Sequence, residues 1–465
     1  MEKLSADQKE AGSFRDPSGF LFYRNGALFR QVNLSYKEDY DCLIRSGLYQ
    51  KLAERGLLIP HEETEEKGLQ GPVYKVMRPE QIAFISYPFE WGFSQLKDAA
   101  LLTLEVQKTA LEHKMSLKDA NAFNIQFRTG RPVLIDTLSF KTYEEGRPWV
   151  AYRQFCQHFL APLALMSYRD IRLNQLGRVY LDGIPLDLAS RLLPWRSRLD
   201  FGLLIHLHLH ARSQQRFADR PIKEETGKFS RLAFLGLIES LEKAVRRLNW
   251  KPGRTEWGDY YQATNYSEPA FEHKKDLVAD FLSQAKPASV WDLGANTGFF
   301  SRISGERGIP TVAWDIDPLA VEKNYLECRG RAEKNVLPLL LDLGNPTPAL
   351  GWGHEERRSF AQRGPADLVL ALALVHHLAI SNHLPLERIA GFFARLSRFL
   401  VIEFVPKSDS QVKRLFLSRD DIFPHYDRAS FEAAFSRYFA IEKAAPVRQS
   451  ERILYLMRTL QTPLL

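Results

Sequence analysis

The stretch Val290-Trp-Asp-Leu-Gly-Ala-Asn-Thr-Gly298, which a helical pattern follows from Phe299, decides the fold of the second half of this chain. Its apolar start predicts a buried strand, Gly294 lets the backbone turn tightly, and Gly298 lets the helix begin close to a ligand. The start of a helix offers unpaired N–H groups that suit a carboxylate. A dinucleotide site would need glycine in place of Asn296, so the stretch favours a cofactor with a free amino acid end. The alternative is an ordinary strand-to-helix turn.

Apolar strands alternate with helices through the second half, which predicts a doubly wound, Rossmann-like α/β domain with a parallel sheet covered on both faces. We expect seven strands, at Ser289–Leu293, Thr311–Asp315, Leu337–Asp342, Asp367–Ala373, Phe399–Phe404, Phe439–Lys443 and Arg452–Met457. The first half mixes strands with helices such as Leu101–Lys114 and Arg153–Met166, and is expected to be α+β. The Pro-Gly pair before Arg254 marks the boundary, so the expected domains are 1–249 and 250–465.

Acidic residues stand at the ends of the first three strands of the second half. Asp292 can orient the glycine loop or meet an amino group. Asp315 can accept two hydrogen bonds from the hydroxyls of a ribose, although a solvated helix cap is the alternative. Asp317, directly before a proline, is the better candidate for that cap. Asp342, with Leu343, can accept a hydrogen bond from an adenine amino group.

These segments, taken in order, resemble the first three motifs of the class I S-adenosylmethionine-dependent methyltransferase family, over roughly Tyr260 to Met457. The resemblance implies that S-adenosylmethionine is the cofactor. It also implies a cofactor site made of Tyr266, Asp292, Gly294, Asn296, Thr297, Gly298, Asp315, Ile316, Asp342, Leu343 and Leu372. Trp257, Tyr260 and Tyr266 are implied as a lid over the sulfonium, which aromatic faces attract, or else as packing residues at a domain junction.

Three side chains are candidates for the chemistry of methyl transfer. His376 and His377 follow the fourth strand, at the edge of the sheet where ligands bind in open α/β folds, and a neutral imidazole can act as a general base. Glu403 ends the fifth strand at the same edge. A structural role is the alternative for each. The segment Lys407–Arg437, with several basic and aromatic side chains, is expected either to close over a substrate or to be a solvated helix.

The first half contains a segment that resembles the catalytic segment of kinase-like phosphotransferases. Asp119 and Asn124 match the Asp-x-x-x-x-Asn of their catalytic loop, and Asp136 matches the metal-binding Asp that follows a strand. An expected strand at Ile82–Tyr87 and a helix at Leu101–His113 stand in the required order. If that site is intact, these three residues hold a metal; otherwise no metal is expected.

Departures from the kinase pattern favour a weakened, substrate- or partner-holding module. Leu117 replaces the usual histidine, and no glycine-rich phosphate loop precedes it. Thr137-Leu138 replaces Phe-Gly, and the strand Ala27–Val32 offers Arg30 rather than a nucleotide lysine. The alternatives are an unrelated α+β domain and an active kinase.

Three histidines alternate at His206, His208 and His210. The surrounding leucines suggest a helix, on which His206 and His210 lie one turn apart. A structural role is expected rather than metal binding, since no acidic or cysteine partner stands nearby.

The chain as a whole is also similar to bacterial nodulation-related methyltransferases, on the segments Asp119–Phe127, Ile135–Phe140 and Trp149–Phe155. That similarity favours methylation of oxygen or nitrogen on a small-molecule or carbohydrate-like acceptor that the first half presents. One alternative is an RNA or protein methyltransferase whose first half binds the macromolecule. Another is a non-catalytic S-adenosylmethionine-binding regulator.

Composition sets wide limits on the function. The net charge of +7 permits anionic partners but does not require nucleic acid. Three scattered cysteines, the absence of an apolar leader and the lack of a long apolar run indicate a cytoplasmic protein without disulfides or a membrane span.

Overall fold

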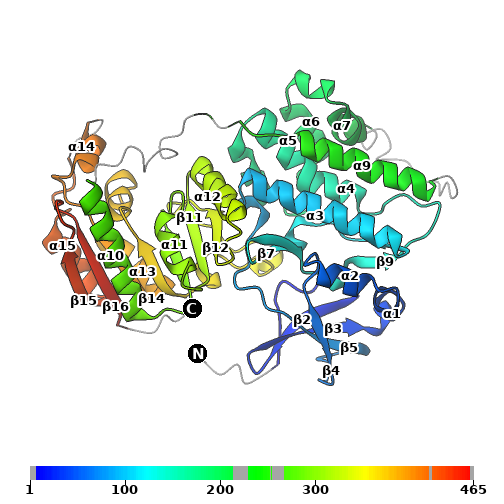
Figure 1. The fold of residues 1–465 in the computed structure, drawn as a ribbon, viewed down its shortest axis with the longest axis horizontal. Coiled ribbons are helices and arrows are strands. Elements are labelled where there is room, and N and C mark those ends of the chain that lie inside the picture. The colour runs from blue at the N-terminus through cyan, green and yellow to red at the C-terminus, as the bar shows by residue number, and fades with distance from the viewer. Residues whose placement is uncertain (1–6, 213–228, 252, 254–266, 418–420, 461–465) are drawn as a thin grey trace. The chain divides into compact units, whose positions relative to one another are not determined.

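The computed structural model describes residues 7–212, 229–251, 253, 267–417 and 421–460, and the chain divides into two units (Figure 1). The first unit comprises Met1–Lys251 together with Leu350–Arg357, and the second comprises Pro252–Ala349 and Arg358–Leu465. The sequence did not indicate that Leu350–Arg357 groups with the first unit. None of the described helices is both long and apolar enough to cross a membrane.

The second unit is built on a seven-stranded sheet of order β12-β11-β10-β13-β14-β16-β15. Its strands are β10 (Val290–Leu293), β11 (Thr311–Asp315), β12 (Val336–Leu340), β13 (Ala366–Ala371), β14 (Ser397–Phe404), β15 (Phe439–Pro446) and β16 (Ile453–Thr459). The five strands from β10 to β14 run parallel, whereas β16 is antiparallel to both β14 and β15. The expectation of a wholly parallel sheet is therefore wrong for β16, which runs against the other six strands of this sheet. The short turn 447–452 that joins β15 to β16, closed by a 2.9 Å bond from Val447 N–H to Arg452 C=O, is too short for a parallel crossover.

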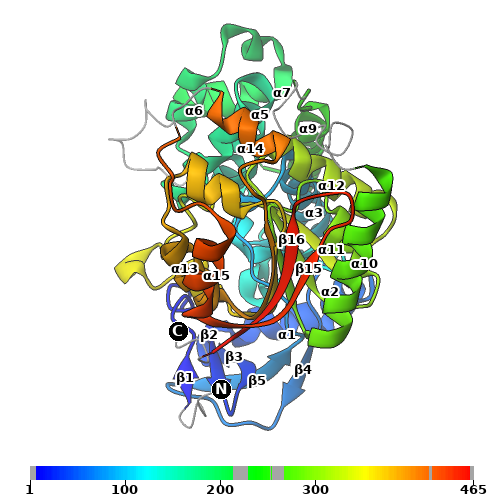
Figure 2. The same cartoon turned by 90° about the vertical axis from the view of Figure 1, so that its left-hand side faces the viewer.

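Helices cover both faces of this sheet (Figure 2). The helices α10 (Glu268–Ala285), α11 (Phe299–Gly305) and α12 (Pro318–Gly330) lie on one face, and α13 (Leu386–Leu396) and α15 (Arg428–Ser436) on the other. The apolar side of α10, with Val278 and Phe281, packs on side chains of the parallel strands such as Leu368 and Val401. This burial fixes the sheet between two helical layers and leaves its strand ends to form the site.

The parallel register brings the acidic residues to one edge. Leu293 pairs with Trp314, and Asp315 pairs with Leu340. The carboxyl ends of β10, β11 and β12 are therefore level, and Asp292 and Asp315 lie near neighbouring tips.

The first unit begins with a five-stranded antiparallel sheet of order β1-β2-β3-β5-β4. Its strands are β1 (Gln8–Lys9), β2 (Gly19–Arg24), β3 (Ala27–Asn33), β4 (His61–Thr64) and β5 (Val73–Pro79), and α1 (Lys37–Arg45) and α2 (Leu48–Glu54) come between β3 and β4. The long helix α3 (Phe93–Glu112) follows, then the antiparallel pair β6 (Met115–Leu117) with β9 (Phe140–Thr142), and between these two strands in the chain the hairpin β7 (Ile125–Arg128) with β8 (Arg131–Leu134). The remaining described helices include α4 (Tyr152–Phe155), α5 (Ala161–Tyr168), α6 (Leu186–Leu192), α7 (Phe201–Leu203) and α9 (Arg231–Arg247).

The strand predicted at Ile82–Tyr87 is wrong. The strand that pairs with β3 ends at Pro79, which has no N–H to continue the ladder. Residues 82–87 are irregular, and the Ser86 N–H donates instead to the side-chain oxygen of Gln126 at 2.9 Å.

Gly298 and Gly308 provide a matched test of the tight start of α11. Both have a left-handed φ, +80° and +79°, but a Cβ on Gly298 would lie 2.4 Å from the Asn324 side chain, whereas one on Gly308 would meet nothing within 4 Å. We predict that Gly308→Ala costs about 1 kcal/mol of unfolding free energy through backbone strain, and that Gly298→Ala costs about 2 kcal/mol more. Urea unfolding of both variants measures the difference. Equal losses would mean that the close approach of Asn324 is unimportant.

Candidate cofactor and catalytic site

The loop after β10 is held to the tip of β11 by hydrogen bonds. Gly294, Asn296 and Gly298 all have positive φ, at 81°, 51° and 80°. This winding turns the Asn296 N–H toward Asp315, whose Oδ2 accepts it at 2.7 Å, while Oδ1 accepts the Asp317 N–H at 2.8 Å. Each carboxylate oxygen keeps a further lone pair, so Asp315 remains able to accept hydrogen bonds from a ligand.

Burial shifts the pKa of both acidic residues at these tips upward. Asp315 is 8% exposed, and burial, only partly offset by its backbone hydrogen bonds, raises its pKa to about 6. Burial also raises the pKa of Asp292 to about 7, against the hydrogen bond from Ser301 Oγ at 2.7 Å. Because Ser301 is in α11, Asp292 joins the end of β10 to the helix that starts after the loop. This contact matches the loop-orienting alternative proposed for Asp292.

Arg302 supports the loop from behind, and sequence reasoning missed it. Its guanidinium donates to the Thr297 C=O at 2.6 Å and to Asn324 Oδ1 at 3.0 Å, and it pairs with Glu333 at 2.9 Å. These contacts reach from α11 to α12 and beyond, so no local sequence pattern signals them. The loop is thus held in place by contacts with α11, α12 and Glu333.

Apolar side chains flank the acidic edge. Ile316, directly after Asp315, is 58% exposed, which is unusual for a large aliphatic side chain at the tip of a buried strand. Leu343 is half-buried, and the neighbouring Asp342 is exposed, with Oδ1 accepting the Gly344 N–H at 2.8 Å. Ile316 thus offers an exposed apolar side chain directly after Asp315, and Asp342 an exposed carboxylate.

The remaining expected cofactor residues are Leu372, which is buried, and an aromatic residue before α10. Leu372 is 7% exposed and packs in the core between α10 and the sheet. Tyr266, Trp257 and Tyr260 lie outside the described residues, so their expected role as a lid stays a prediction.

The two histidines differ in their surroundings. His376 is buried, and its Nδ1 has no hydrogen-bond partner among the described residues. His377 begins the π-helical segment His377–Ser381 and is half-buried. Burial holds the pKa of His376 well below its usual value and lowers that of His377 to about 4, and the Arg452 charge lowers both further. Both imidazoles are therefore neutral at physiological pH.

Glu403, in contrast, is held in buried ion pairs. Its Oε2 lies 2.7 Å from Lys274 Nζ of α10, and its Oε1 lies 3.8 Å from an Arg452 nitrogen. Arg452 in turn pairs with Asp409, the N-cap residue of α14 (Ser410–Phe416), at 2.7 Å. This network ties α10, β14 and the segment after β14 together. It favours the ion-pairing alternative for Glu403 and identifies Lys274 and Arg452, which sequence reasoning missed.

We predict that Glu403→Gln lowers the free energy of unfolding by about 3–5 kcal/mol, because it leaves the buried Lys274 ammonium without its carboxylate. The matched control is Glu272→Gln. It removes the exposed 3.1 Å ion pair between Glu272 and Lys275, which both lie on α10 like Lys274, and it should cost less than about 1 kcal/mol. Denaturant unfolding measures both. A stable Glu403→Gln protein that retains cofactor and loses only turnover would instead support a catalytic Glu403.

The kinase-like residues of the first unit are brought together. The Asp119 carboxylate hydrogen-bonds with the side chains of Asn124 and Gln154, and burial and the nearby Asp136 raise its pKa. Asp136 Oδ2 accepts from Ser139 Oγ at 2.5 Å, and its Oδ1 accepts the Leu138 N–H at 3.1 Å. Asp136 also forms an ion pair with Arg30 of β3.

The histidine series lies on a helix, as the leucines indicated. The ring nitrogens of His206 bond to the hydroxyls of Tyr152 and Ser240, both at 2.8 Å. Those of His208 bond to Ser190 and Ser197 at 2.7 and 2.9 Å. Among the described residues no group of histidine, cysteine, aspartate or glutamate side chains is arranged to hold a metal ion. These hydrogen bonds to hydroxyl groups indicate a structural role for His206 and His208.

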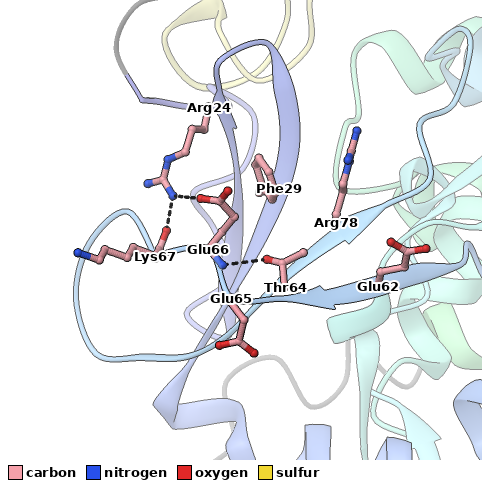
Figure 3. Close-up of a pocket in the computed structure, with 8 residues that line it drawn as sticks. All are labelled: Arg24, Phe29, Glu62, Thr64, Glu65, Glu66, Lys67 and Arg78. Carbon is pink, nitrogen blue, oxygen red and sulfur yellow. Dashed lines mark hydrogen bonds and ion pairs between the residues drawn. The ribbon is translucent and has the colours of Figure 1, made fainter.

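An open hollow of about 630 Å³ lies on one face of the sheet of the first unit (Figure 3). Phe29 lines it, with charged side chains such as Glu62 and Arg78, and Arg24 on its rim is engaged by Glu66 and the Lys67 C=O. Successive side chains of a strand point to opposite faces, so this hollow lies on the other face from Arg30 and its partner Asp136.

The second unit thus has the doubly wound, Rossmann-like α/β fold that the alternation of strands and helices predicted, with β16 reversed. Over 454 residues the chain is 35% identical to the nodulation protein NoeA of Rhizobium meliloti (strain 1021), with 96% of this chain and 95% of the relative covered. The chain belongs to the family of nodulation protein NoeA. The resemblance to nodulation-related proteins is thus confirmed.

Solved structures are similar to this chain over part of its length. Magnesium protoporphyrin IX methyltransferase (ChlM) from Synechocystis PCC 6803 with bound SAH is 19% identical, with a TM-score of 0.30, over 41% of this chain and 84% of its own. WbdD, crystallised with the kinase inhibitor LY294002, is 16% identical, with a TM-score of 0.28, over 40% of each chain. No protein-family model matches the sequence.

Proposed function

We propose that the second unit binds S-adenosylmethionine and transfers its methyl group to an oxygen or nitrogen of a small-molecule or carbohydrate-like acceptor. The observation that carries the proposal is the Asp315 carboxylate, buried at the tip of β11 and bonded only to backbone N–H groups in its printed hydrogen bonds. Because these N–H donors are neutral, they do not compensate the negative charge of Asp315. The two neighbouring hydroxyls of a ribose suit such a carboxylate as hydrogen-bond donors.

The remaining residues fit the other parts of that cofactor. The loop after β10 would lie under the amino acid end of the cofactor, where Gly294 and Gly298 carry no side chain. The exposed Ile316 would pack on the adenine ring. Asp342 would accept from the adenine amino group. When bound, the cofactor supplies an electrophilic methyl group on a sulfonium.

The acceptor side of the site would be formed by the residues after β13 and β14. An in-line transfer needs the acceptor held in one orientation and its proton removed. His377, half-buried and neutral, is the candidate to take that proton, while the Lys274–Glu403–Arg452 network holds the surrounding backbone. His376 would act as a buried support for its neighbour.

The first unit, in this proposal, is a kinase-like module that holds the acceptor or a partner. Its order of elements supports this role: an antiparallel sheet with helices between β3 and β4, then the long helix α3, then β6, which Asp119 follows, and β8, which Asp136 follows.

We predict that Asp315→Ala weakens S-adenosylmethionine binding by about 1–3 kcal/mol, through the loss of charge-assisted hydrogen bonds. Wild-type affinity should also fall as the pH drops below about 6, because protonation removes the charge of Asp315. The control is Asp367→Asn, near the opposite, amino end of β13, where the carboxylate accepts only the Ala288 N–H among its printed bonds. Calorimetric titration with the cofactor and its demethylated product tests the proposal. No uptake of either by the wild-type protein would refute it.

We predict that His377→Ala lowers turnover about 100-fold or more while leaving cofactor affinity nearly unchanged, if the imidazole takes the acceptor proton. Turnover of the wild type should decline as the pH falls toward about 4, where His377 becomes protonated. His376→Ala should instead lower the melting temperature, because that ring is buried. Label transfer from S-adenosylmethionine into fractionated acceptors, alongside thermal unfolding, separates these effects. Full turnover by His377→Ala would exclude it as the base.

A further inference from the structure

The Asp119–Asn124–Asp136 cluster of the first unit has the side chains that a kinase-like fold uses to hold magnesium. Magnesium needs near-octahedral coordination by oxygens, with carboxylate oxygens turned toward the ion. Here both oxygens of Asp136 are already engaged, one by Ser139 Oγ at 2.5 Å and the other by the Leu138 N–H at 3.1 Å and by Arg30. Both carboxylate oxygens of Asp136 are therefore occupied by donors of the protein itself.

Arg30 supplies the positive charge that a metal would otherwise bring. It lies in β3, is 9% exposed, and its guanidinium contacts the Asp136 carboxylate directly. A guanidinium is charged at every physiological pH, so the pair cannot open by deprotonation of the arginine. A divalent cation at Asp136 would meet this fixed positive charge at close range and be repelled.

The hairpin that leads into β3 offers no place for nucleotide phosphates. The strands β2 and β3 are joined by a two-residue turn, Asn25 and Gly26, both with positive φ. This is the tight hairpin that an Asn-Gly pair favours, and two residues are too few to cradle a phosphate chain. The magnesium of the kinase-like family does not fit the surroundings of Asp136.

We infer that Arg30 stands in the place of the divalent cation, so that the Asp119–Asn124–Asp136 cluster is a metal-free structural clasp and the first unit does not carry out magnesium-dependent phosphoryl transfer. The clasp joins β3 to the segment after β8 through Asp136 and its Ser139 and Arg30 partners. This inference concerns the first unit and is independent of methyl transfer.

The test is a titration of the full chain with Mn²⁺. Binding is measured as the loss of the electron paramagnetic resonance signal of the free ion. Wild type and Asp136→Asn should give the same curve, because Asp136 binds no ion in either. Arg30→Met, which keeps the length of the side chain without its charge, should gain a site that binds Mn²⁺ at least about tenfold more tightly than the wild type, because it leaves a buried carboxylate unpaired. Adding Asp136→Asn to Arg30→Met should remove that site.

Two further measurements keep the inference open to refutation if Arg30→Met does not fold. Arg30→Lys retains the charge and should bind no more Mn²⁺ than the wild type. The melting temperature of the wild type should respond to ATP in the same way with magnesium as with EDTA. Wild-type Mn²⁺ binding that Asp136→Asn abolishes, or an ATP-induced shift that requires magnesium, would overturn the inference.

Discussion

The hydrogen bond from the Asn296 N–H to the Asp315 carboxylate is the contact on which the second unit depends. It joins the loop after β10 to the tip of β11, and the parallel register of these strands brings the two groups within 2.7 Å. Asn296, which has a left-handed backbone without being a glycine, is held by this bond, and the Arg302 contact with the Thr297 C=O supports the loop beside it. The start of α11 and the acidic edge of the sheet are therefore positioned together.

Glu403 and His377, at that edge, differ in their charge state: Glu403 is a charged group in ion pairs, and His377 is a neutral one. Glu403 is surrounded by the cations Lys274 and Arg452, so its charge is compensated within the protein and stabilises the packing of α10 on β14. His377 is kept neutral by burial and by the Arg452 charge. Arg452, one of the two cations that pair with Glu403, thus also favours the neutral form of the His377 imidazole.

Local patterns predicted most of the second unit. The positions of the glycines at 294 and 298 in a loop and of the acidic residue 315 at a strand tip could be predicted because each depends on neighbours in the sequence. The predictions failed for two strands. The antiparallel direction of β16 follows from the short turn 447–452, and the strand expected at Ile82–Tyr87 does not form because β5, which pairs with β3 and β4, ends at Pro79. The partners Arg302 and Lys274 lie far along the chain from the groups they hold, so no periodicity marks them.

The two units show how the partner of a carboxylate determines whether it remains able to bind a ligand. In the hydrogen bonds described above, Asp315 is held by neutral N–H groups, which fix its orientation and partly offset the rise in its pKa that burial causes. Asp136 is held by a guanidinium, which fixes its orientation and compensates its charge. A sequence motif records only that each position is aspartate. The identical side chains differ in their electrostatic surroundings because β3 places Arg30 against Asp136, whereas the loop after β10 turns the Asn296 N–H toward Asp315.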